Sequence, residues 1–226
     1  MSRSKRYLEL KSLIDPKKIY SLEEAIELVK KTSTVTFDAS VEVHLKLGID
    51  SSKSDQQTRG LVRLPHGTGK TKRVAAFVGE AKETEAKAAG ADLAGGEELI
   101  AQIAQSGKMD FDVAVATPEM MPKLAKIAKI LGPRGLMPNP KTETVGADVK
   151  KMVEEMKGGK IAWKNDDTGN VHQLVGKVSM ENAKLLENLK AFLDSVQRAK
   201  PASAKGIYIP SATLTSSMGP AVKIQI

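Results

Sequence analysis

The stretch LPHGTGKTKRV, residues 64–74, separates two kinds of sequence in this chain. Before it, residues 40–48 read SVEVHLKLG, in which apolar and polar side chains alternate as on a strand with one open polar face. After it, the runs RVAAFVG (73–79) and FDVAVATP (111–118) are continuously apolar, which is typical of parallel strands buried on both faces. This change predicts that two differently built parts of the protein meet here.

Helical patterns alternate with the apolar runs of the middle segment. They cover residues 82–91, 96–107, 119–132 and 148–157, the last of which ends at a glycine pair. Alternating strands and helices predict a small Rossmann-like α/β unit with a parallel sheet and right-handed crossovers.

Patterns typical of an open-faced sheet occupy both ends of the chain. Ser21 and Glu24 form a capping box, which predicts a helix over residues 21–31. The C-terminal part predicts a hairpin, a long amphipathic helix, a short strand and a closing strand, over residues 160–178, 179–200, 207–209 and 213–226.

The simplest organisation is one domain made of both chain ends and interrupted by another. We expect residues 1–66 and 160–226 to form an α+β sandwich, and residues 67–159 to form an inserted α/β domain. The predicted hinge between them consists of His66, Gly67, Gly158 and Gly159.

The charge distribution differs between these two parts. The chain has a net charge of +8, but residues 68–159 carry 14 basic and 13 acidic residues and the remainder carries 21 and 14. A polyanionic partner is therefore expected on the domain made of the chain ends. Since aromatic residues make up only 4% of the chain, contacts to phosphates and shape are expected to outweigh a broad stacking platform.

The glycine-lysine-threonine of the quoted stretch raises a nucleotide-binding alternative. A P-loop needs a first glycine at position 64, which is Leu64, and a helix after the threonine, where this sequence is strand-like. The sequence contains no other catalytic motif. We therefore expect a non-enzymatic protein, and binding of ATP or GTP would favour the alternative, a P-loop NTPase.

The residue types present also limit cofactors and location. The absence of cysteine excludes disulfides and thiolate metal sites and is compatible with a reducing cytoplasm. Since the three histidines are scattered in sequence, neither a metal site nor another cofactor is expected. No apolar run approaches the roughly 20 residues that span a bilayer, so no membrane contact is expected.

Three further segments each have a structural and a functional interpretation. The loop LGPRGLMPNPKTETVG, residues 131–146, is either a rigid connection or a contact for RNA or a partner. Phe37 is either a core residue or a ring at the sheet rim that presses against a nucleotide. Gly219 in TSSMGPA, residues 215–221, marks either a β-bulge or a close approach to a ligand, and Gly219→Val is expected to leave the fold largely intact.

Several of these motifs together resemble the ribosomal protein L1 family in its bacterial form. The resemblance rests on LPHGTGK, FDVAVATPEMM, LGPRGLMPNPKTETV, KNDDTGNVH and SSMGP, and it covers essentially the whole chain. It implies the interrupted two-domain architecture and a monomer in the large subunit of the cytoplasmic ribosome. It also implies binding to large-subunit rRNA, formation of a mobile stalk near the exit-site tRNA, assistance in tRNA release, and repression through binding to the protein's own mRNA.

The same resemblance implies a set of RNA-binding residues. These are Thr36, Phe37, Ser40, Glu42, Ser217, Met218 and Gly219. The family often has a basic residue where this chain has Thr36, and often threonine where it has Ser217. The first departure removes an expected phosphate contact and the second keeps a hydroxyl group, so RNA binding is expected to survive with a lower electrostatic contribution.

Overall fold

The computed structural model describes residues 4–53 and 55–226, and its contacts divide the chain into two compact units. Unit 1 consists of Met1–Gly69 and Ile161–Ile226, and unit 2 consists of Lys70–Lys160. Residues 1–3 and 54, which belong to the predicted α+β sandwich, lie outside the described residues. The chain is a mixture of helices and sheets, as expected. That the two units are independently folding domains stays a prediction.

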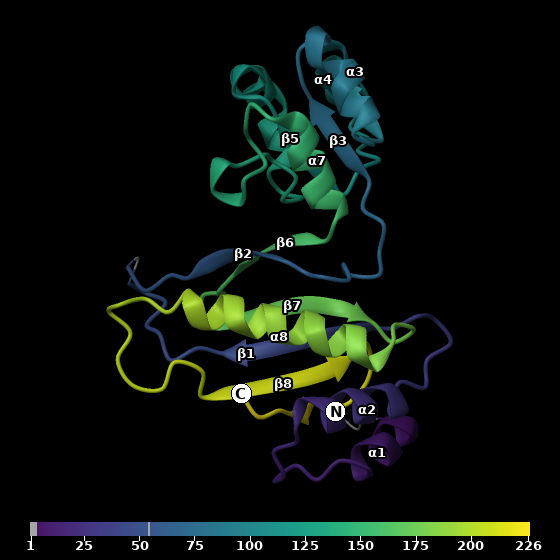
Figure 1. Ribbon diagram of the computed structural model, residues 1–226, viewed down its shortest axis with the longest axis vertical. Coiled ribbons are helices and arrows are strands. Elements are labelled where there is room, and N and C mark those ends of the chain that lie inside the picture. Colours follow the sequence, from purple (N-terminus) through teal and green to yellow (C-terminus); the bar gives the residue numbers. More distant parts are fainter. Residues whose placement is uncertain (1–3, 54) are drawn as a thin grey trace. The chain divides into compact units, whose positions relative to one another are not determined.

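Unit 1 is built on a four-stranded antiparallel sheet in the order β7-β1-β8-β9 (Figure 1). The strands are β1 (Ser40–Lys46), β7 (Asn170–Lys177), β8 (Ser211–Ser216) and β9 (Val222–Lys223). Along β1, Val41, Val43 and Leu45 are buried and the residues between them are not. The predicted strand is thus confirmed, with one apolar face and one polar face.

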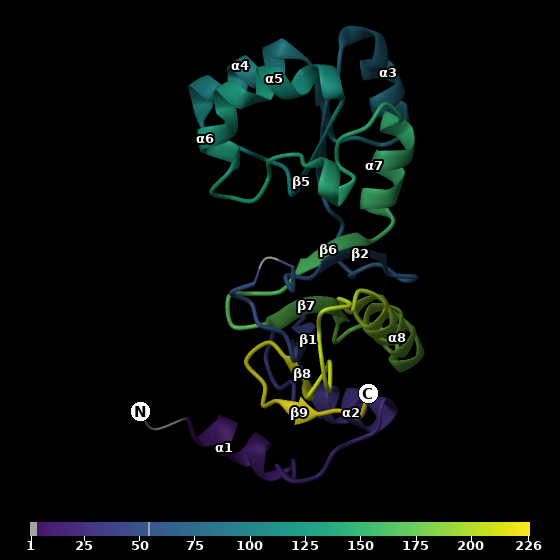
Figure 2. The same ribbon diagram turned by 90° about the vertical axis from the view of Figure 1, so that its left-hand side faces the viewer.

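Helices α2 (Leu22–Lys31) and α8 (Asn182–Arg198) cover the apolar face of this sheet, and Figure 2 shows both on the same side of it. The helix start predicted at Ser21 is confirmed, because the backbone N–H of Glu24 donates to Ser21 Oγ at 3.3 Å; of the capping box this is the half that the structure shows, and the Glu24 carboxylate lies 3.5 Å from Lys18 Nζ. Helix α1 (Lys5–Ser12) lies below β9 in Figure 2 and away from α8. The opposite sheet face therefore stays free of α2 and α8.

The predicted hairpin over residues 160–178 is wrong. Strand β6 (Lys160–Lys164) pairs with β2 (Arg59–Arg63) in a separate two-stranded sheet, whereas β7 pairs with β1. A tight turn does lie between β6 and β7, because the Asp166 carboxylate accepts the backbone N–H groups of Thr168 and Asn170. This turn moves the chain from one sheet into the other instead of folding it back on itself.

Packing of Trp163 gives the physical reason for this difference. Its indole N–H donates to Ser195 Oγ on α8 at 3.2 Å, and its ring meets Phe192 edge-to-face at 6.3 Å between centroids. A Cβ added at Gly60 of β2 would lie 2.8 Å from the same indole. Strand β6 is therefore fixed against α8 and β2 by a bulky side chain, which a hairpin with β7 could not bury in the same way.

Other strand expectations at the C-terminus need correction. Residues 207–209 form no strand, although Tyr208 O accepts the backbone N–H of Gly48 at 2.8 Å. The tail contains two strands, β8 and β9, which form an antiparallel hairpin around residues 217–221. The interruption at TSSMGPA is accordingly a hairpin turn and not a β-bulge.

Unit 2 contains a three-stranded parallel sheet in the order β4-β3-β5, with helices on both faces. The strands are β3 (Val74–Phe77), β4 (Leu93–Gly95) and β5 (Val113–Ala116), and the helices of eight or more residues are α3 (Glu80–Ala88), α4 (Glu97–Ser106) and α7 (Val149–Lys157). All four residues of β3 are buried, which confirms the interpretation of its continuous apolar run. Strand β4 was not expected, because three residues are too short to show a period.

The helix predicted over residues 119–132 is broken into short segments. These are η1 (Pro118–Met120), α5 (Met121–Leu124), η2 (Ala125–Ile127) and α6 (Ala128–Leu131). Pro118 and Pro122 each stand in the first turn of a segment and lack the N–H of a continuous helix. Leu124, Ile127 and Leu131 are nevertheless fully buried, so the apolar stripe was read correctly although the helix was not.

The loop over residues 131–146 is internally braced. Asn139 caps its segment η3 (Pro140–Thr142), because the Asn139 side chain accepts the backbone N–H of Lys141. Asn139 O also accepts a hydrogen bond from the Thr144 hydroxyl at 3.1 Å. These bonds favour the interpretation of a rigid connection. A partner contact through its exposed Arg134 and Lys141 remains a prediction.

Candidate nucleic-acid interface

Residues from both halves of unit 1 meet at one end of the polar sheet face. Ser40 opens β1 and Ser217 follows β8, and the two exchange hydrogen bonds although 177 positions separate them. The backbone N–H of Ser217 donates to Ser40 O at 2.9 Å, and the backbone N–H of Ser40 donates to Ser217 Oγ at 3.2 Å. Glu42 lies next along the face, opposite Thr215 of β8.

Two large apolar side chains are exposed in the segments beside these serines. Phe37 is 54% exposed and Met218 is 71% exposed. The core interpretation of Phe37 is therefore wrong, and Thr36 beside it is exposed as well. Exposed apolar side chains beside an open polar face are typical of a binding surface.

The turn after β8 holds Met218 in a strained conformation. Its φ is 65°, in the left-handed region that residues with a Cβ adopt at a cost of about 1–2 kcal/mol. The backbone N–H of Gly219 then donates to Ser216 O at 2.8 Å and closes the turn. Backbone strain that displays an apolar side chain to solvent points to a function for that side chain.

Gly219 is required by packing within the turn itself. A Cβ built on it would lie 2.3 Å from Ser216 Oγ and 3.2 Å from Ser216 O. Ser216 is buried, and its hydroxyl oxygen has no hydrogen-bond partner among the described residues. The expectation that Gly219→Val leaves the fold largely intact is thus wrong, because the added side chain would displace the turn.

The polar face continues along the sheet as rows of residues that face one another across strands. The rows are Lys177–Ser40, Leu174–Glu42–Thr215, His172–His44–Thr213–Lys223 and Asn170–Lys46–Ser211. In the first row, Lys177 Nζ donates to Ser40 Oγ at 3.0 Å. This row brings a cation next to Ser40, on the side of β1 opposite to Ser217.

The N-terminal helix adds residues that the sequence interpretation missed. Arg6 and Tyr7 of α1, with Ser4 before it, line a depression of 340 Å³ together with Met218 and Gly219. The basic N-terminal segment had not been assigned to the candidate site from the sequence. Its amphipathic pattern is weak, and no local signal placed it beside residues more than 200 positions away.

The predicted hinge residues have different surroundings in the two segments that contain them. The backbone N–H of His66 donates to Asn188 Oδ1 at 3.0 Å, and Asn188 Nδ2 donates to Gly67 O at 2.8 Å. Gly158 caps α7, and Gly159 has a φ of 89°. Asn188 is fully buried in α8 and was not singled out from the sequence, where it stands as one polar residue on an apolar stripe.

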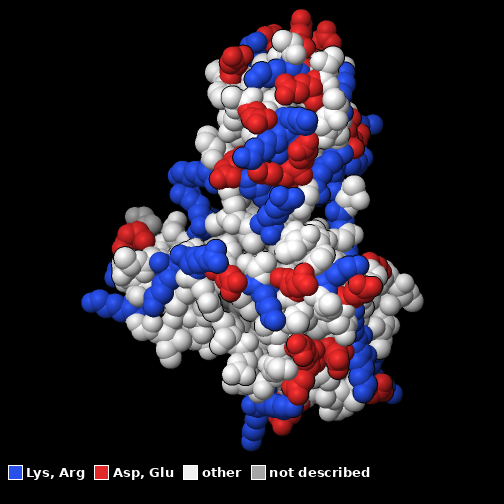
Figure 3. All heavy atoms as spheres, in the orientation of Figure 1, with Lys and Arg blue, Asp and Glu red and all other residues white. Residues whose placement is uncertain are grey.

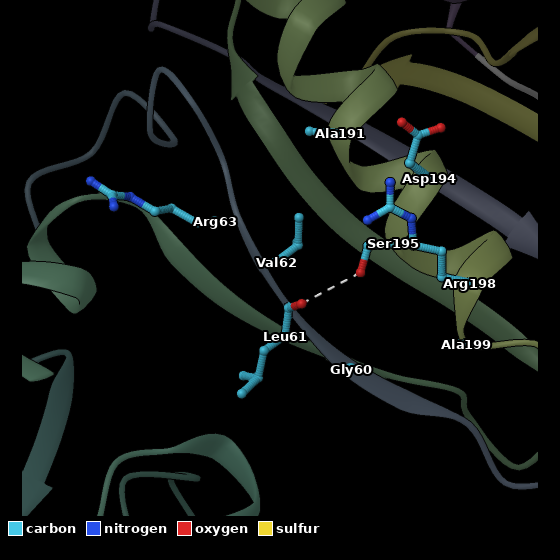
Figure 4. Close-up of a pocket in the computed structure, with 9 residues that line it drawn as sticks. All are labelled: Gly60, Leu61, Val62, Arg63, Ala191, Asp194, Ser195, Arg198 and Ala199. Carbon is cyan, nitrogen blue, oxygen red and sulfur yellow. Dashed lines mark hydrogen bonds between the residues drawn. The ribbon is translucent and has the colours of Figure 1, made fainter.

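A second depression in unit 1 lies between β2 and α8, away from the predicted RNA-binding residues. It has a volume of 610 Å³ and includes Arg63 and Arg198, which Figure 4 shows at opposite ends of the drawn residues. Ser195 Oγ donates to Leu61 O at 3.4 Å and ties the two elements together (Figure 4). Because the two guanidinium groups do not converge, this depression offers no paired anion site.

The geometry around residues 69–71 does not form a phosphate cradle. No helix follows Thr71, since the chain continues directly into β3, and Lys70 Nζ lies 3.4 Å from Asp112 Oδ1. Open α/β sheets bind nucleotides beyond the carboxyl ends of their strands. There, a 710 Å³ depression in unit 2 is lined by four acidic residues, Glu80, Glu83, Glu97 and Glu98, and by one cation, Lys123, whose Nζ lies 2.6 Å from Glu97 Oε1. The excess of acidic residues disfavours a triphosphate there.

Within residues 4–53 and 55–226, the structure contains neither a candidate metal centre nor a helix that could span a membrane. No group of three or more histidine, aspartate or glutamate side chains in this part of the chain could hold a metal ion. Within the same residues, no helix combines the length and the apolar character needed to cross a bilayer.

A comparison with protein families places these observations in context. The model of the Ribosomal protein L1p/L10e family matches residues 29–220, a range that contains all of the predicted RNA-binding residues. This is a family of structural RNA-binding proteins and not of enzymes, so the NTPase alternative is wrong. Its members are proteins of the large ribosomal subunit that bind rRNA. The chain therefore belongs to the ribosomal protein L1 family.

Proposed function

We propose that the polar sheet face of unit 1 and the adjacent turns form the rRNA-binding site. The residues proposed to contact RNA are Thr36, Phe37, Ser40, Glu42, Ser217, Met218 and Gly219. The observation that carries the proposal is the joint exposure of Phe37 and Met218 near the Ser40–Ser217 contact. Apolar side chains beside hydrogen-bonding groups suit unpaired or splayed nucleotides, which proteins recognise by stacking and by contacts to 2′-hydroxyl groups.

Each proposed contact follows from the chemistry of its group. The Phe37 ring offers a face for stacking, and Met218 offers a polarisable surface for a base or ribose. Ser217 Oγ already accepts the N–H of Ser40, so its own hydrogen is left to donate to a phosphate or ribose oxygen. Glu42 can only accept hydrogen bonds when ionised, which selects base amino groups and 2′-hydroxyl groups over phosphates.

We further propose that the protein forms the mobile stalk near the exit-site tRNA and assists tRNA release as a monomer within the ribosome. In this proposal unit 1 holds the rRNA and unit 2 is the moving part. The charges support this assignment, since residues 68–159 carry a net charge of only +1. Figure 3 shows basic and acidic side chains intermixed on the visible face of unit 2. A similar RNA structure in the protein's own mRNA would bind the same surface, which would give translational repression.

We expect rRNA binding to depend strongly on salt concentration. Each phosphate neutralised by the protein contributes about −0.7 to −0.9 to the slope of log K against log salt concentration. A slope steeper than about −2 is expected, which corresponds to about three phosphate contacts or more. The measurement is a titration of the purified protein with the rRNA fragment at several salt concentrations. A slope near zero would contradict phosphate-directed binding, and no binding to the fragment would contradict the proposed site.

Met218→Gly should make the protein more stable and at the same time weaken its binding to rRNA. Glycine adopts a φ of 65° without strain, so the free energy of unfolding should rise by about 0.5–1 kcal/mol after allowing for glycine's greater freedom in the unfolded chain. The affinity for rRNA should fall, because the exposed thioether is lost. Denaturant unfolding and RNA titration measure the two effects. Met218→Ala is the control, since it should lose affinity without becoming more stable. Wild-type affinity in both variants would remove Met218 from the site.

We expect unit 1 to fold and bind rRNA without unit 2. The deletion should join Gly69 to Ile161 through a short glycine linker. This junction keeps Gly67, whose carbonyl Asn188 binds, and removes Lys160, whose ammonium pairs with Glu143 and Glu155 of unit 2. The affinity for the rRNA fragment should stay within about tenfold of wild type, while assistance in tRNA release should be lost. A loss beyond about a hundredfold in a folded deletion protein would mean that unit 2 contributes to the primary site.

A further inference from the structure

Four titratable side chains form a chain on the polar face, and the two in its middle belong to the row next to Glu42 and Thr215. His44 on β1 and His172 on β7 are cross-strand partners, and their Nδ1 atoms lie 2.9 Å apart. His44 Nε2 lies 3.9 Å from Glu42 Oε2, and His172 Nε2 lies 3.6 Å from Asp166 Oδ2. The order is therefore carboxylate, imidazole, imidazole, carboxylate, and one end of it is a residue of the proposed RNA site.

The hydrogen-bonding geometry decides how many protons the two imidazoles can carry. Two neutral imidazoles carry two N–H groups, and one of these must lie between the Nδ1 atoms to make a 2.9 Å contact attractive. One Nε2 atom is then left without a proton while it faces a carboxylate. One added proton gives both Nε2 atoms an N–H directed at a carboxylate. A second added proton would place two N–H groups against each other at the Nδ1 contact. The geometry thus suits the uptake of a single proton, shared by the pair.

The surroundings disfavour a proton on His44 in the free protein. Burial lowers the pKa of His44 below its usual value, the charge of His172 lowers it further, and Glu42 partly opposes both effects. The cations nearby are Lys46, two residues along β1, and Lys223, beyond Thr213 in the same row. The anions are Glu42 and Asp166, at the two ends of the chain.

Bound RNA would change this balance. RNA phosphates next to Glu42 and Asp166 would add negative potential and exclude water from this face. Both effects raise the free energy of two ionised carboxylates that no positive charge neutralises. A proton on the imidazole pair offsets that cost and leaves Glu42 able to accept a hydrogen bond from RNA. We propose that rRNA binding by unit 1 is coupled to the uptake of one proton by the His44–His172 pair, so that the affinity rises as the pH falls from 8 toward 6. This inference rests on the proposed position of RNA on the polar face.

Linkage between proton binding and RNA binding sets the direction of the pH dependence. If the pKa of the pair is higher in the complex than in the free protein, the complex binds more protons between the two pKa values, and lower pH favours it. For one proton the slope of log K against pH cannot be steeper than −1. For a pKa raised by about half a unit to one unit, the total increase in affinity is bounded at about three- to tenfold, and the part of it that falls between pH 7.5 and pH 6.0 is smaller.

The test is a titration of the full-length protein with the rRNA fragment at pH 5.5–8.0 and constant ionic strength. Calorimetry in two buffers that differ in ionisation enthalpy counts the protons taken up. His44→Gln and His172→Gln should each flatten the pH dependence, and His172 is the safer site because its side chain is 55% exposed. His66→Gln is the matched control, since this third histidine pairs with Glu187 of α8 at 2.7 Å and should keep the wild-type slope.

The possible outcomes separate this inference from the proposed function. If wild type does not bind the fragment at any pH, the proposed site is wrong. If wild type binds with an affinity that does not change with pH, the site stands and the proton coupling is wrong. A slope that persists in folded His44→Gln and His172→Gln variants would also overturn the inference, because the proton would then bind elsewhere. A slope that is lost in these variants and kept in His66→Gln supports it.

Discussion

Phe37→Ala is expected to weaken rRNA binding by about 1–3 kcal/mol, or roughly five- to 150-fold, which is the usual contribution of one aromatic ring stacked on a base. The ring is 54% exposed in the free protein, so its loss should leave the free energy of unfolding within about 0.5 kcal/mol of wild type. Few aromatic residues are present, and another ring could not easily replace it. Affinity is measured by titration with the rRNA fragment, and stability by denaturant unfolding.

Two further variants show whether stacking causes this loss. Phe37→Trp keeps a planar ring and should retain most of the affinity. Ile207→Ala removes an apolar side chain that is 76% exposed and lies outside the proposed site, so it should bind rRNA like wild type. If Phe37→Ala also bound like wild type, the exposure of Phe37 would need another explanation and the proposed site would lose its main support.

Asn188→Ala is expected to lower the free energy of unfolding by about 2–4 kcal/mol, because its amide has three buried or half-buried partners. Its Nδ2 group donates to Gly67 O at 2.8 Å and to Val175 O at 2.9 Å, and its Oδ1 accepts the backbone N–H of His66. Truncation leaves these backbone groups without a partner and opens a small cavity under the chain at residues 66–67.

The control for this variant lies on the same helix. Asn182→Ala changes an exposed asparagine of α8 and should alter the free energy of unfolding by no more than about 0.5 kcal/mol. Both variants are measured by denaturant unfolding of the full-length protein. An equally small effect at Asn188 would mean that water replaces its three hydrogen bonds and that it does not secure the predicted first hinge segment.

Local patterns decided which segments become strands and helices and which of their faces are buried. The alternation around Val41, Val43 and Leu45 predicted an open-faced strand, since successive side chains of a strand point to opposite faces. The capping box at Ser21 predicted the start of α2, because one side-chain oxygen satisfies one N–H of the first turn. The uneven charge distribution and the absence of P-loop spacing likewise pointed away from a nucleotide and toward a polyanion. The RNA-binding residues came from the family resemblance and not from these patterns.

Only the tertiary structure decided which segments pair and which side chains meet. Alternation shows that β6 has a buried face but not whether it pairs with β7 or β2, and packing of Trp163 against α8 selects β2. The Ser40–Ser217 and His44–His172 contacts join residues 177 and 128 positions apart, which no local period can indicate. Gly219 owes its role to a buried hydroxyl group of Ser216, visible only once the turn is folded. The physical reason is that periodicity reports the environment of a face, whereas long-range pairing depends on the shape and hydrogen-bonding groups of the packed neighbours.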